Sequence, residues 1–387
     1  MRQRRLPVVF MRGGTSKALV FHERDLPAGD RLRDAIFLAA MGSPDPTLRQ
    51  LDGMGGGVSS LSKVCIIAPS SRADADIDYT FAQIGVRDAD VDYTANCGNM
   101  SSAMGPFAVE EGLVTPEGGA ATVRIYNTNT RKLITSSFAV ADGVPVVEGD
   151  FVNPGVAGQG APIRLDFHDP GGAATGRLLP TGRPADVFEH ADLPGPVRVS
   201  MVDATNPCVF VSAADLGATG HESAAAIDAD AGLMERLELV RRLACVAMGL
   251  APDLAAAAGV RALPKVALVA PARDYRLASG DAVPAGGYDV AVRMISMGQA
   301  HRAIPLTGAM CTAVAAEIAG STVHDARAGA QRRADGSFLI GHSSGLRPVA
   351  ADVASEGNGW AARSVTVFAT ARRLMEGNIL VPAATGL

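Results

Sequence analysis

Cys97 lies near the start of a stretch, Asn96 to Leu113, that contains no charged residue before its last turn. The pattern predicts a buried helix capped by Asn96 and ended by Gly112, because Asn favours helix starts and Gly favours the position past a helix end. The first turn of such a helix binds carboxylates and favours a thiolate over a thiol. Buried cysteines are also often inert, so a structural thiol is the alternative. The residues expected to contact a ligand here are Asn96, Gly98, Asn99 and Met100.

Lysine is rare in this chain. Of 35 basic residues only four are lysine, namely Lys17, Lys63, Lys132 and Lys265. Where arginine supplies the general surface charge, a retained lysine can serve where a group must give up its proton. Lys17 and Lys63 both follow a serine beside a glycine-rich segment, and we single out Lys63 as the candidate base.

The segments before these two lysines are built from glycine and hydroxyl residues. Gln50 to Lys63 holds four glycines within five residues, and 12–17 reads Arg-Gly-Gly-Thr-Ser-Lys. Neither is a phosphate-binding motif, because neither lysine follows a glycine and the third glycine of GxGxxG is missing. Their bare backbone can approach a carboxylate closely; a flexible turn or a hairpin turn is the alternative. The ligand contacts expected here are Gly14, Thr15, Ser16, Lys17 and Ser60.

The sequence repeats itself about 200 residues later, which indicates a duplication. Met11 to Phe21 corresponds to Met201 to Val211, and Gly57 to Pro69 corresponds to Gly259 to Pro271. Each half is expected to contain several strands, one amphipathic helix and one uncharged helix. This pattern predicts an α+β protein with two pseudo-symmetric domains, each a curved or barrel-like sheet around a central helix.

The amphipathic helices are expected over 31–41 and 233–248, and the central helices begin at Asn96 and Leu306. We place the domains at 1–188 and 189–387, joined by a linker near 180–196 that is rich in Pro and Gly. The last strand can return to the N-terminal domain. The active site is expected in the cleft between the domains, where both central helices would begin.

Aligning the halves shows where the symmetry is broken. Counted from Tyr79 and Tyr288, Cys97 aligns with Thr307, and Cys311 falls about one turn inside the second central helix. A buried structural thiol is the better interpretation of Cys311. The residues of the second half that are expected to bind substrate are Asn206, His301, Thr307, Gly308 and Ala309.

The composition excludes several classes of function. A net charge of −5 without a Lys/Arg-rich tract argues against nucleic-acid binding. The apolar run at 6–11 is too short for a signal peptide, and no run of about 18 apolar residues could cross a membrane. Five widely spaced cysteines without a CxxC and seven scattered histidines favour reduced thiols in the cytoplasm and give no metal site or cofactor. A homodimer is compatible with the sequence, which does not define the oligomeric state.

Several segments together resemble one family. MRGGTSK, QLDGMGG, NCGNMSSAMGPFA, AHRA and LTGAMCTAVA are similar to the PrpF-type proteins, the 2-methylaconitate cis–trans isomerases, and to the related 3-methylitaconate Δ-isomerases and 4-oxalomesaconate tautomerases. The resemblance covers nearly the whole chain. It implies the diaminopimelate-epimerase-like fold and cofactor-independent proton transfer on an unsaturated di- or tricarboxylate. It also implies that Lys63 and Cys97 face the substrate, whereas Thr307 replaces the second cysteine of the epimerases.

These expectations combine into one hypothesis. A neutral Lys63 amine removes an allylic proton, and Cys97 assists as an acid or as a polar neighbour. The N–H groups at 13–16, 98–99 and 307–309 hold the enolate-like charge. Two alternatives stay open: an amino-acid racemase or epimerase that uses Cys97 and Cys311, and a non-catalytic carboxylate-binding protein. The motifs favour the methylaconitate and methylitaconate branch over the tautomerases.

Overall fold

The computed structural model describes residues 3–94, 96–277, 279–327, 337–357 and 359–385. The chain divides into two compact units, each with its own hydrophobic core. Unit 1 comprises Met1–Leu165 and Phe368–Leu387, and unit 2 comprises Asp166–Val367. Both ends of the chain therefore contribute to unit 1.

Unit 1 is built on a mixed sheet in which the strands pair in the order β21, β1, β2, β3, β4, β6, β7. The pairs β2–β3 and β4–β6 are parallel and the other pairs are antiparallel. The bounds are β1 Gln3–Gly13, β2 Ser16–His22, β3 Lys63–Pro69, β4 Ile77–Ile84, β5 Val91–Asp92, β6 Ala120–Asn127, β7 Lys132–Ala141, β8 Val144–Pro145, β9 Ile163–His168 and β21 Ala371–Pro382.

Unit 2 repeats this arrangement in the order β10, β11, β12, β13, β16, β18, β19. Here β12–β13 and β16–β18 are the parallel pairs. The bounds are β10 Asp186–Phe188, β11 Val197–Ala204, β12 Asn206–Ser212, β13 Lys265–Pro271, β14 Tyr275–Arg276, β15 Ala282–Val283, β16 Val290–Ser296, β17 Gln299–Ala300, β18 Phe338–His342, β19 Gly345–Glu356 and β20 Gly359–Ala369. Because the six strands β1–β2–β3–β4–β6–β7 and β11–β12–β13–β16–β18–β19 pair with the same senses, the predicted duplication is confirmed.

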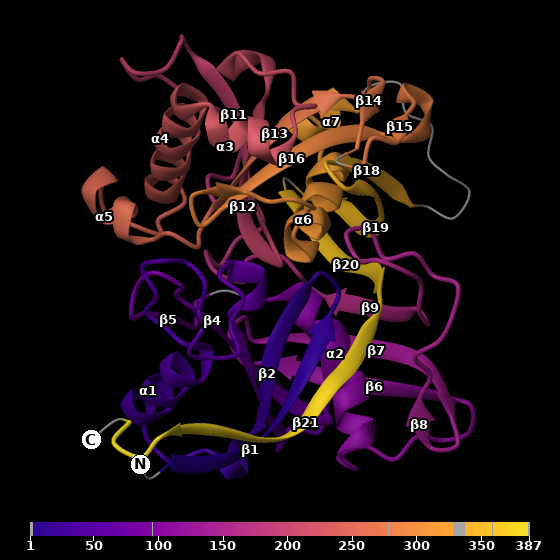
Figure 1. Ribbon diagram of the computed structural model, residues 1–387. Coiled ribbons are helices and arrows are strands. Elements are labelled where there is room, and N and C mark those ends of the chain that lie inside the picture. Colours follow the sequence, from indigo (N-terminus) through magenta and orange to yellow (C-terminus); the bar gives the residue numbers. More distant parts are fainter. Residues whose placement is uncertain (1–2, 95, 278, 328–336, 358, 386–387) are drawn as a thin grey trace. The chain divides into compact units, whose positions relative to one another are not determined.

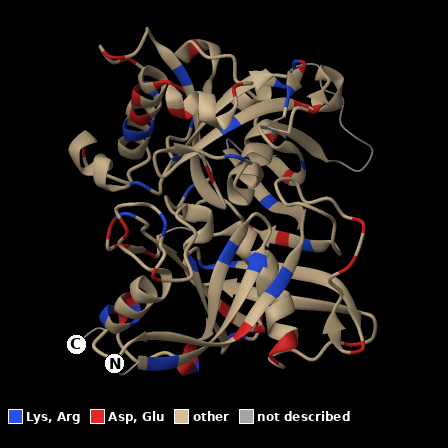
Figure 2. Ribbon diagram, viewed as in Figure 1, with Lys and Arg blue, Asp and Glu red and all other residues tan. Residues whose placement is uncertain are grey.

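One uncharged helix packs inside each sheet. Helix α2 (Gly98–Glu110) contacts β1, β2, β6, β7, β8 and β21, and α6 (Leu306–Glu317) contacts β11, β12 and β19 (Figure 1). Neither helix carries a charged residue before its last position, in contrast to α4 (Ala231–Ala247) (Figure 2). This absence of charge is what allows the two helices to be enclosed by protein.

The predicted cap of α2 is wrong by one residue. Cys97, not Asn96, is the N-cap residue, and its side chain makes no capping hydrogen bond. The Asn96 Oδ1 instead accepts a hydrogen bond from Asn127 Nδ2 at 3.3 Å, at the end of β6. The Asn96 side chain is therefore used to brace the segment before the helix, and the helix begins one position later than a capping Asn96 would allow.

The amphipathic helices lie where the sequence predicts them. Helix α1 (Asp30–Met41) buries Ile36, Phe37, Ala40 and Met41 in the core of unit 1, and α4 packs on the core of unit 2. The shorter helices are α3 Ala224–Ala229, α5 Leu254–Gly259 and α7 Thr322–Ala326, and the 3-10 turns are Glu23–Asp25, Ser59–Leu61, Ala214–Leu216 and Ala285–Gly287. Among the described residues no helix is both long and apolar enough to span a membrane.

Candidate active site

The side of β3 that carries Lys63 is opposite to the side that packs on α1. Val64 and Ile66 belong to the core cluster with α1, and successive strand residues point to opposite sides, so Lys63 and Cys65 point the other way. Val20 pairs with Cys65 in the parallel β2–β3 register, on the same side as His22. His22 reaches α2, where Nε2 lies 2.9 Å from Glu111 Oε2 and the ring lies 5.1 Å from that of Phe107. Lys63 thus lies on the α2 side of the sheet.

Lys63 is a buried lysine with a neutral hydrogen-bond acceptor. Its side chain is 7% exposed, and Nζ donates to Gln83 Oε1 at 2.5 Å. The ring of Phe81 lies on the same side of β4, with its centroid 4.9 Å from Nζ. An amine enclosed in this way loses most of its water, which is what a lysine that acts as a base requires.

Cys97 and Lys63 both lie close to Cys65. Burial raises the pKa of the Cys65 thiol, the nearby Cys97 raises it further, and Lys63 lowers it. Cys65 Sγ donates to Tyr79 OH at 3.8 Å, and burial holds the pKa of Tyr79 well above its usual range. Cys65 and Tyr79 are therefore neutral. Cys65 lies beside both predicted catalytic groups, Lys63 and Cys97, and Tyr79 is its hydrogen-bond partner.

The β1–β2 turn is attached to the first turn of α2 by Asn99. Asn99 Nδ2 donates to Thr15 Oγ1 at 3.1 Å, and Thr15 N–H donates to Asn99 Oδ1 at 3.4 Å. Gly14 has a φ of +50°, and a Cβ at this position would overlap Asn99 Oδ1. Only glycine fits at position 14 without strain.

The backbone N–H groups of this turn are used within unit 1. Gly14 N–H donates to the Thr370 carbonyl at 2.9 Å, and the Thr15 N–H points to Asn99. The groups of the turn left to contact a ligand are its hydroxyls. Thr15 Oγ1 accepts from Asn99, so its own proton can be donated elsewhere, and Ser16 lies on the α2 side of β2.

The structure does not bring Lys17 together with Lys63. Lys17 lies on the opposite side of β2 from Ser16, and its Nζ sits 5.4 Å from the ring centroid of Phe10 in the α1 core. Met100 is fully buried along α2. Ser60 lies in the 3-10 turn before β3, two residues before the buried Ser62. The structure therefore groups Ser16, Lys63 and the first turn of α2, and it separates Lys17 from them.

Two glutamines hold the glycine-rich segment in place: Gln50, at its start, and Gln83, which the motif analysis missed. Gln50 Nε2 donates to Ser62 Oγ at 2.7 Å and to Ser43 Oγ at 2.8 Å, while its Oε1 accepts from Gly57 N–H at 2.9 Å. Gln83 Nε2 donates to the carbonyl of Ser62 at 2.8 Å. A buried glutamine in the apolar strand Tyr-Thr-Phe-Ala-Gln-Ile was the available signal for Gln83.

In unit 2 the corresponding β11–β12 turn is attached to the first turn of α6. Thr205, with a φ of +65°, donates its hydroxyl to the Thr307 carbonyl at 2.9 Å, and Asn206 Nδ2 donates to Thr307 Oγ1 at 3.1 Å. A Cβ on Gly308 would overlap the Met294 sulfur, so a larger residue there would have to displace the end of the Met294 side chain. Ala309 N–H donates to the Pro305 carbonyl at 2.9 Å, so this N–H group belongs to the helix.

His301 lies in the segment between β17 and α6. Its backbone N–H donates to the Met294 carbonyl at 2.8 Å, and its Nδ1 accepts from Ala303 N–H at 3.3 Å. The first turn of α6, with Thr307, Gly308, Asn206 and His301 around it, is the candidate carboxylate-binding region of unit 2.

Cys311 is buried inside unit 2. Its Sγ donates to the Val202 carbonyl at 3.3 Å, and burial holds its pKa well above the usual range, with Cys208 beside it as a further cause. A thiol that resists ionisation is poorly suited to proton abstraction from carbon. This arrangement agrees with a structural role for Cys311.

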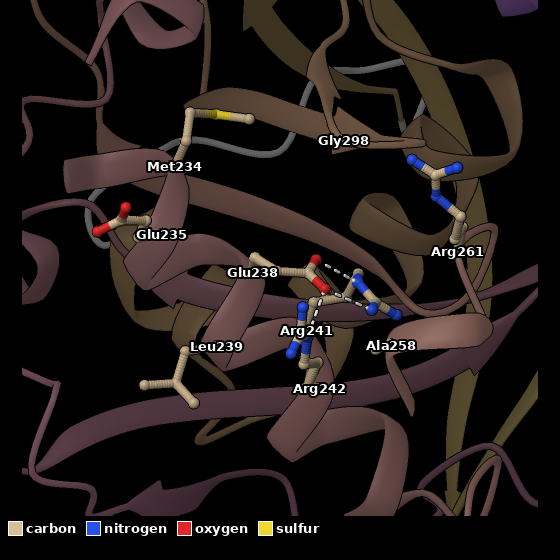
Figure 3. Close-up of a pocket in the computed structure, with 9 residues that line it drawn as sticks. All are labelled: Met234, Glu235, Glu238, Leu239, Arg241, Arg242, Ala258, Arg261 and Gly298. Carbon is tan, nitrogen blue, oxygen red and sulfur yellow. Dashed lines mark hydrogen bonds and ion pairs between the residues drawn. The ribbon is translucent and has the colours of Figure 1, made fainter. Parts of the chain in front are cut away.

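A pocket of about 740 Å³ lies on unit 2 beside α4 and α5 (Figure 3). Glu238 forms ion pairs with Arg241 and Arg242 there, and Arg241 also donates to the carbonyls of Ala257, Val260 and Leu263. None of the predicted site residues lines this pocket. Within the described part of the chain, no group of three or more His, Cys, Asp or Glu side chains could hold a metal ion.

Comparison with known proteins identifies relatives over the whole length. Residues 3–382 match the PrpF protein family. The 3-methylitaconate isomerase of Eubacterium barkeri is 40% identical over 384 residues, covering 99% of this chain and 98% of the relative. The 2-methyl-aconitate isomerase of Shewanella oneidensis is 37% identical over 391 residues, covering 98% of each.

A crystal structure of a methylitaconate-delta-isomerase superposes with a TM-score of 0.81 at 39% identity, covering 100% of this chain and 98% of that one. The expected diaminopimelate-epimerase-like fold is confirmed. The chain belongs to the PrpF family, and it is an isomerase.

Proposed function

We propose that this isomerase moves a proton within an unsaturated di- or tricarboxylate, with 2-methylaconitate as the first candidate substrate. The alternatives in the same class are 3-methylitaconate and 4-oxalomesaconate. The observation that supports the proposal most is the buried Lys63 amine, which lies on the α2 side of the sheet and donates to a neutral amide. The names of the relatives indicate the substrate class.

Lys63 acts as the base in this mechanism. Its neutral amine removes a proton from the carbon next to the double bond, and the electron pair spreads into the conjugated carboxylate. Return of the proton to the same carbon after rotation gives a geometric isomer, and return to the other end of the allylic system gives a positional isomer. Cys97, at the N-cap of α2, contributes as an acid or as a polar contact.

The developing negative charge is stabilised by fixed dipoles. In unit 1 these are the N–H groups of the first turn of α2 and the hydroxyls of Thr15 and Ser16. In unit 2 they are the N–H groups of Thr307 and Gly308 and the Thr307 hydroxyl, whose oxygen already accepts from Asn206. The expectation that both regions serve one substrate stays a prediction. The five cysteines are unpaired, which suits the proposed cytoplasmic location.

The experiment is a proton NMR time course in D₂O with 2-methylaconitate, 3-methylitaconate and 4-oxalomesaconate in turn. Isomer interconversion with deuterium uptake on one acid identifies the substrate. Lys63→Met and Lys63→Arg should lose about 10²–10⁴-fold in kcat, because neither side chain can accept the proton. The matched control is Lys132→Met. Lys132 lies at the start of β7, and this variant should retain normal turnover.

Two results would count against this proposal. A Lys63→Met variant that keeps more than a tenth of the wild-type kcat would exclude lysine as the base. Tight binding of all three acids without exchange of any carbon-bound proton would indicate a carboxylate-binding protein in place of an enzyme that acts on this class.

A further inference from the structure

We propose that Gln83 is a positioning residue that holds the Lys63 amine through a neutral acceptor, in a place where a carboxylate would keep the amine protonated. The inference rests on the proposed role of Lys63 as the base. It assigns a function to a residue that lies outside the glycine-rich, cysteine and helix-start motifs.

The first observation is the direct pairing of the two residues. Lys63 and Gln83 are opposite each other in the antiparallel β3–β4 register, on the side of the sheet that faces α2. Lys63 Nζ donates to Gln83 Oε1 at 2.5 Å, and both residues are less than a tenth exposed. The ladder keeps the Cβ atoms of the two residues adjacent, and the hydrogen bond to Oε1 then places the amine beside Gln83.

The second observation is that the amide of Gln83 has a defined orientation. Its Nε2 donates to the carbonyls of Ser59 at 3.0 Å and Ser62 at 2.8 Å, and Ile84 O lies at 3.4 Å. Carbonyl oxygens only accept, so a flipped amide would place Oε1 against these oxygens and lose the bonds. The oxygen of the amide is therefore directed to Lys63.

The third observation is that the support behind Gln83 is itself rigid. Ile84 N–H donates to the Ser62 carbonyl at 3.0 Å, and the buried Ser62 hydroxyl accepts from Gln50 Nε2 at 2.7 Å. Gln50 is 1% exposed and also holds Gly57 through its Oε1. The glycine-rich segment, Ser62, Gln83 and Lys63 thus form one hydrogen-bonded network inside unit 1.

The chemical consequence follows from the charge of the acceptor. A carboxylate in the place of Gln83 would pair with the ammonium form of Lys63 and keep it protonated, which would prevent it from acting as a base near neutral pH. An amide oxygen fixes the amine with a weaker preference for the charged form. The choice of glutamine over glutamate at position 83 therefore permits a lysine base that is also held in place.

The test compares Gln83→Glu, Gln83→Met and the wild type by pH profiles of kcat/KM for the acid identified above. Gln83→Glu should move the acid limb to higher pH by about 1–3 units and recover activity at high pH, because the opposite charge favours the ammonium. Gln83→Met should lower kcat by about 10-fold or more without an upward shift, because it removes the acceptor that holds the amine and adds no charge. Gln159→Glu, an exposed site with the same charge change, should match the wild type.

A second readout does not depend on activity. Because the chain has four lysines, ¹³Cε-lysine NMR can follow the titration of Lys63 directly, with Lys63→Arg used to assign its signal. The titration midpoint of Lys63 should rise in Gln83→Glu and fall in Gln83→Met. If the glutamate variant does not fold, the methionine variant still tests the inference.

The two proposals fail differently. Superposable pH profiles and equal Lys63 midpoints for the wild type and the folded Gln83 variants would overturn the proposed role of Gln83. If Lys63→Met is inactive in the same experiments, the proposed role of Lys63 as the base still stands. An active Lys63→Met would instead overturn the proposed base itself.

Discussion

Asn206 Nδ2 donates to Thr307 Oγ1 at 3.1 Å, and Asn99 Nδ2 makes the same contact with Thr15 Oγ1 at 3.1 Å in the other unit. In both units a side-chain amide supplies the hydrogen bond that a threonine oxygen accepts. The threonine proton is then free to be donated to a carboxylate. The amide lies on the helix in unit 1 and on the turn side in unit 2, so the two pairs use different positions of the repeat, yet each joins a turn to the start of the central helix.

Thr307→Val should therefore lower kcat/KM by about tenfold or more, because a hydrogen bond from a hydroxyl to a charged group contributes about 1.5–3 kcal/mol. Thr307→Ser keeps the hydroxyl and should stay within about threefold of the wild type. Steady-state kinetics, with urea unfolding to confirm the fold, measure the difference. Equal kinetics for the valine and serine variants would show that this hydroxyl does not contact the substrate.

Gly14→Ala should destabilise unit 1 more than Gly143→Ala, although both glycines have a positive φ, +50° and +80°. The backbone strain costs each variant about 1–2 kcal/mol. At Gly14 the new Cβ also overlaps Asn99 Oδ1, whereas nothing lies within 4 Å of it at Gly143, and overpacking adds about 1–3 kcal/mol.

Urea unfolding curves of both variants, with activity assays on the folded proteins, measure this difference. Activity should fall in Gly14→Ala alone, because the turn that carries Thr15 is displaced. A similar loss of stability in both variants would mean that the turn and α2 can separate at little cost.

Cys311→Ala should keep kcat/KM within about twofold of the wild type, since the buried Sγ makes a hydrogen bond to the Val202 carbonyl and its pKa is raised by burial. The loss of stability should be about 1 kcal/mol, from the small cavity and the lost bond. Cys97→Ala should lower kcat/KM by at least about tenfold. An inactive but folded Cys311→Ala protein would favour the two-cysteine racemase instead.

The stability of the protein should fall below about pH 6.5 because of His342. Burial, followed by the charges of Arg347, Arg293 and His301, holds the pKa of His342 well below its usual range. Below pH 6.5 the unfolded chain binds a proton at this residue and the native protein does not, so the free energy of unfolding decreases as the pH falls. Above that pH the contribution is fully present.

His342→Asn should weaken this dependence by up to about 1.4 kcal/mol per pH unit, because the titrating imidazole is removed. The asparagine Oδ1 can replace the Nδ1 that accepts from Ser344 N–H at 3.2 Å, so the local structure is kept. Urea unfolding between pH 5 and 8 measures the slope, with His324→Asn, at a partly exposed site, as the control. If the His342→Asn and His324→Asn slopes are equal, another group causes the acid sensitivity.

The elements with a clear hydrophobic period could be predicted from the sequence, because their pattern depends only on neighbouring residues. Helix α1 was expected over 31–41 and spans Asp30–Met41, and the uncharged helices were found from their lack of charge. The duplication was visible because both halves kept their strand order. In each case the signal lies within a short segment of the chain.

The side to which a residue points could be predicted less well. Ser16 and Lys17 are adjacent in one motif, yet they lie on opposite sides of β2, because that strand begins at Ser16. Gln83 was missed because its importance comes from the register of β3 against β4, which joins residues twenty positions apart. Motif spacing cannot reveal such partners until the strands are paired.

Strand β1 of unit 1, which lies between β2 and β21, pairs along its whole length, from Gln3 to Gly13, with β21, Ala371 to Pro382. During synthesis β1 leaves the ribosome long before its partner exists, so it must wait until all the residues between β1 and β21 have been translated. Until then it presents an unpaired edge that other chains can bind. Unit 2, whose residues are continuous, can fold while unit 1 waits, and unit 1 is completed only once β21 has been made.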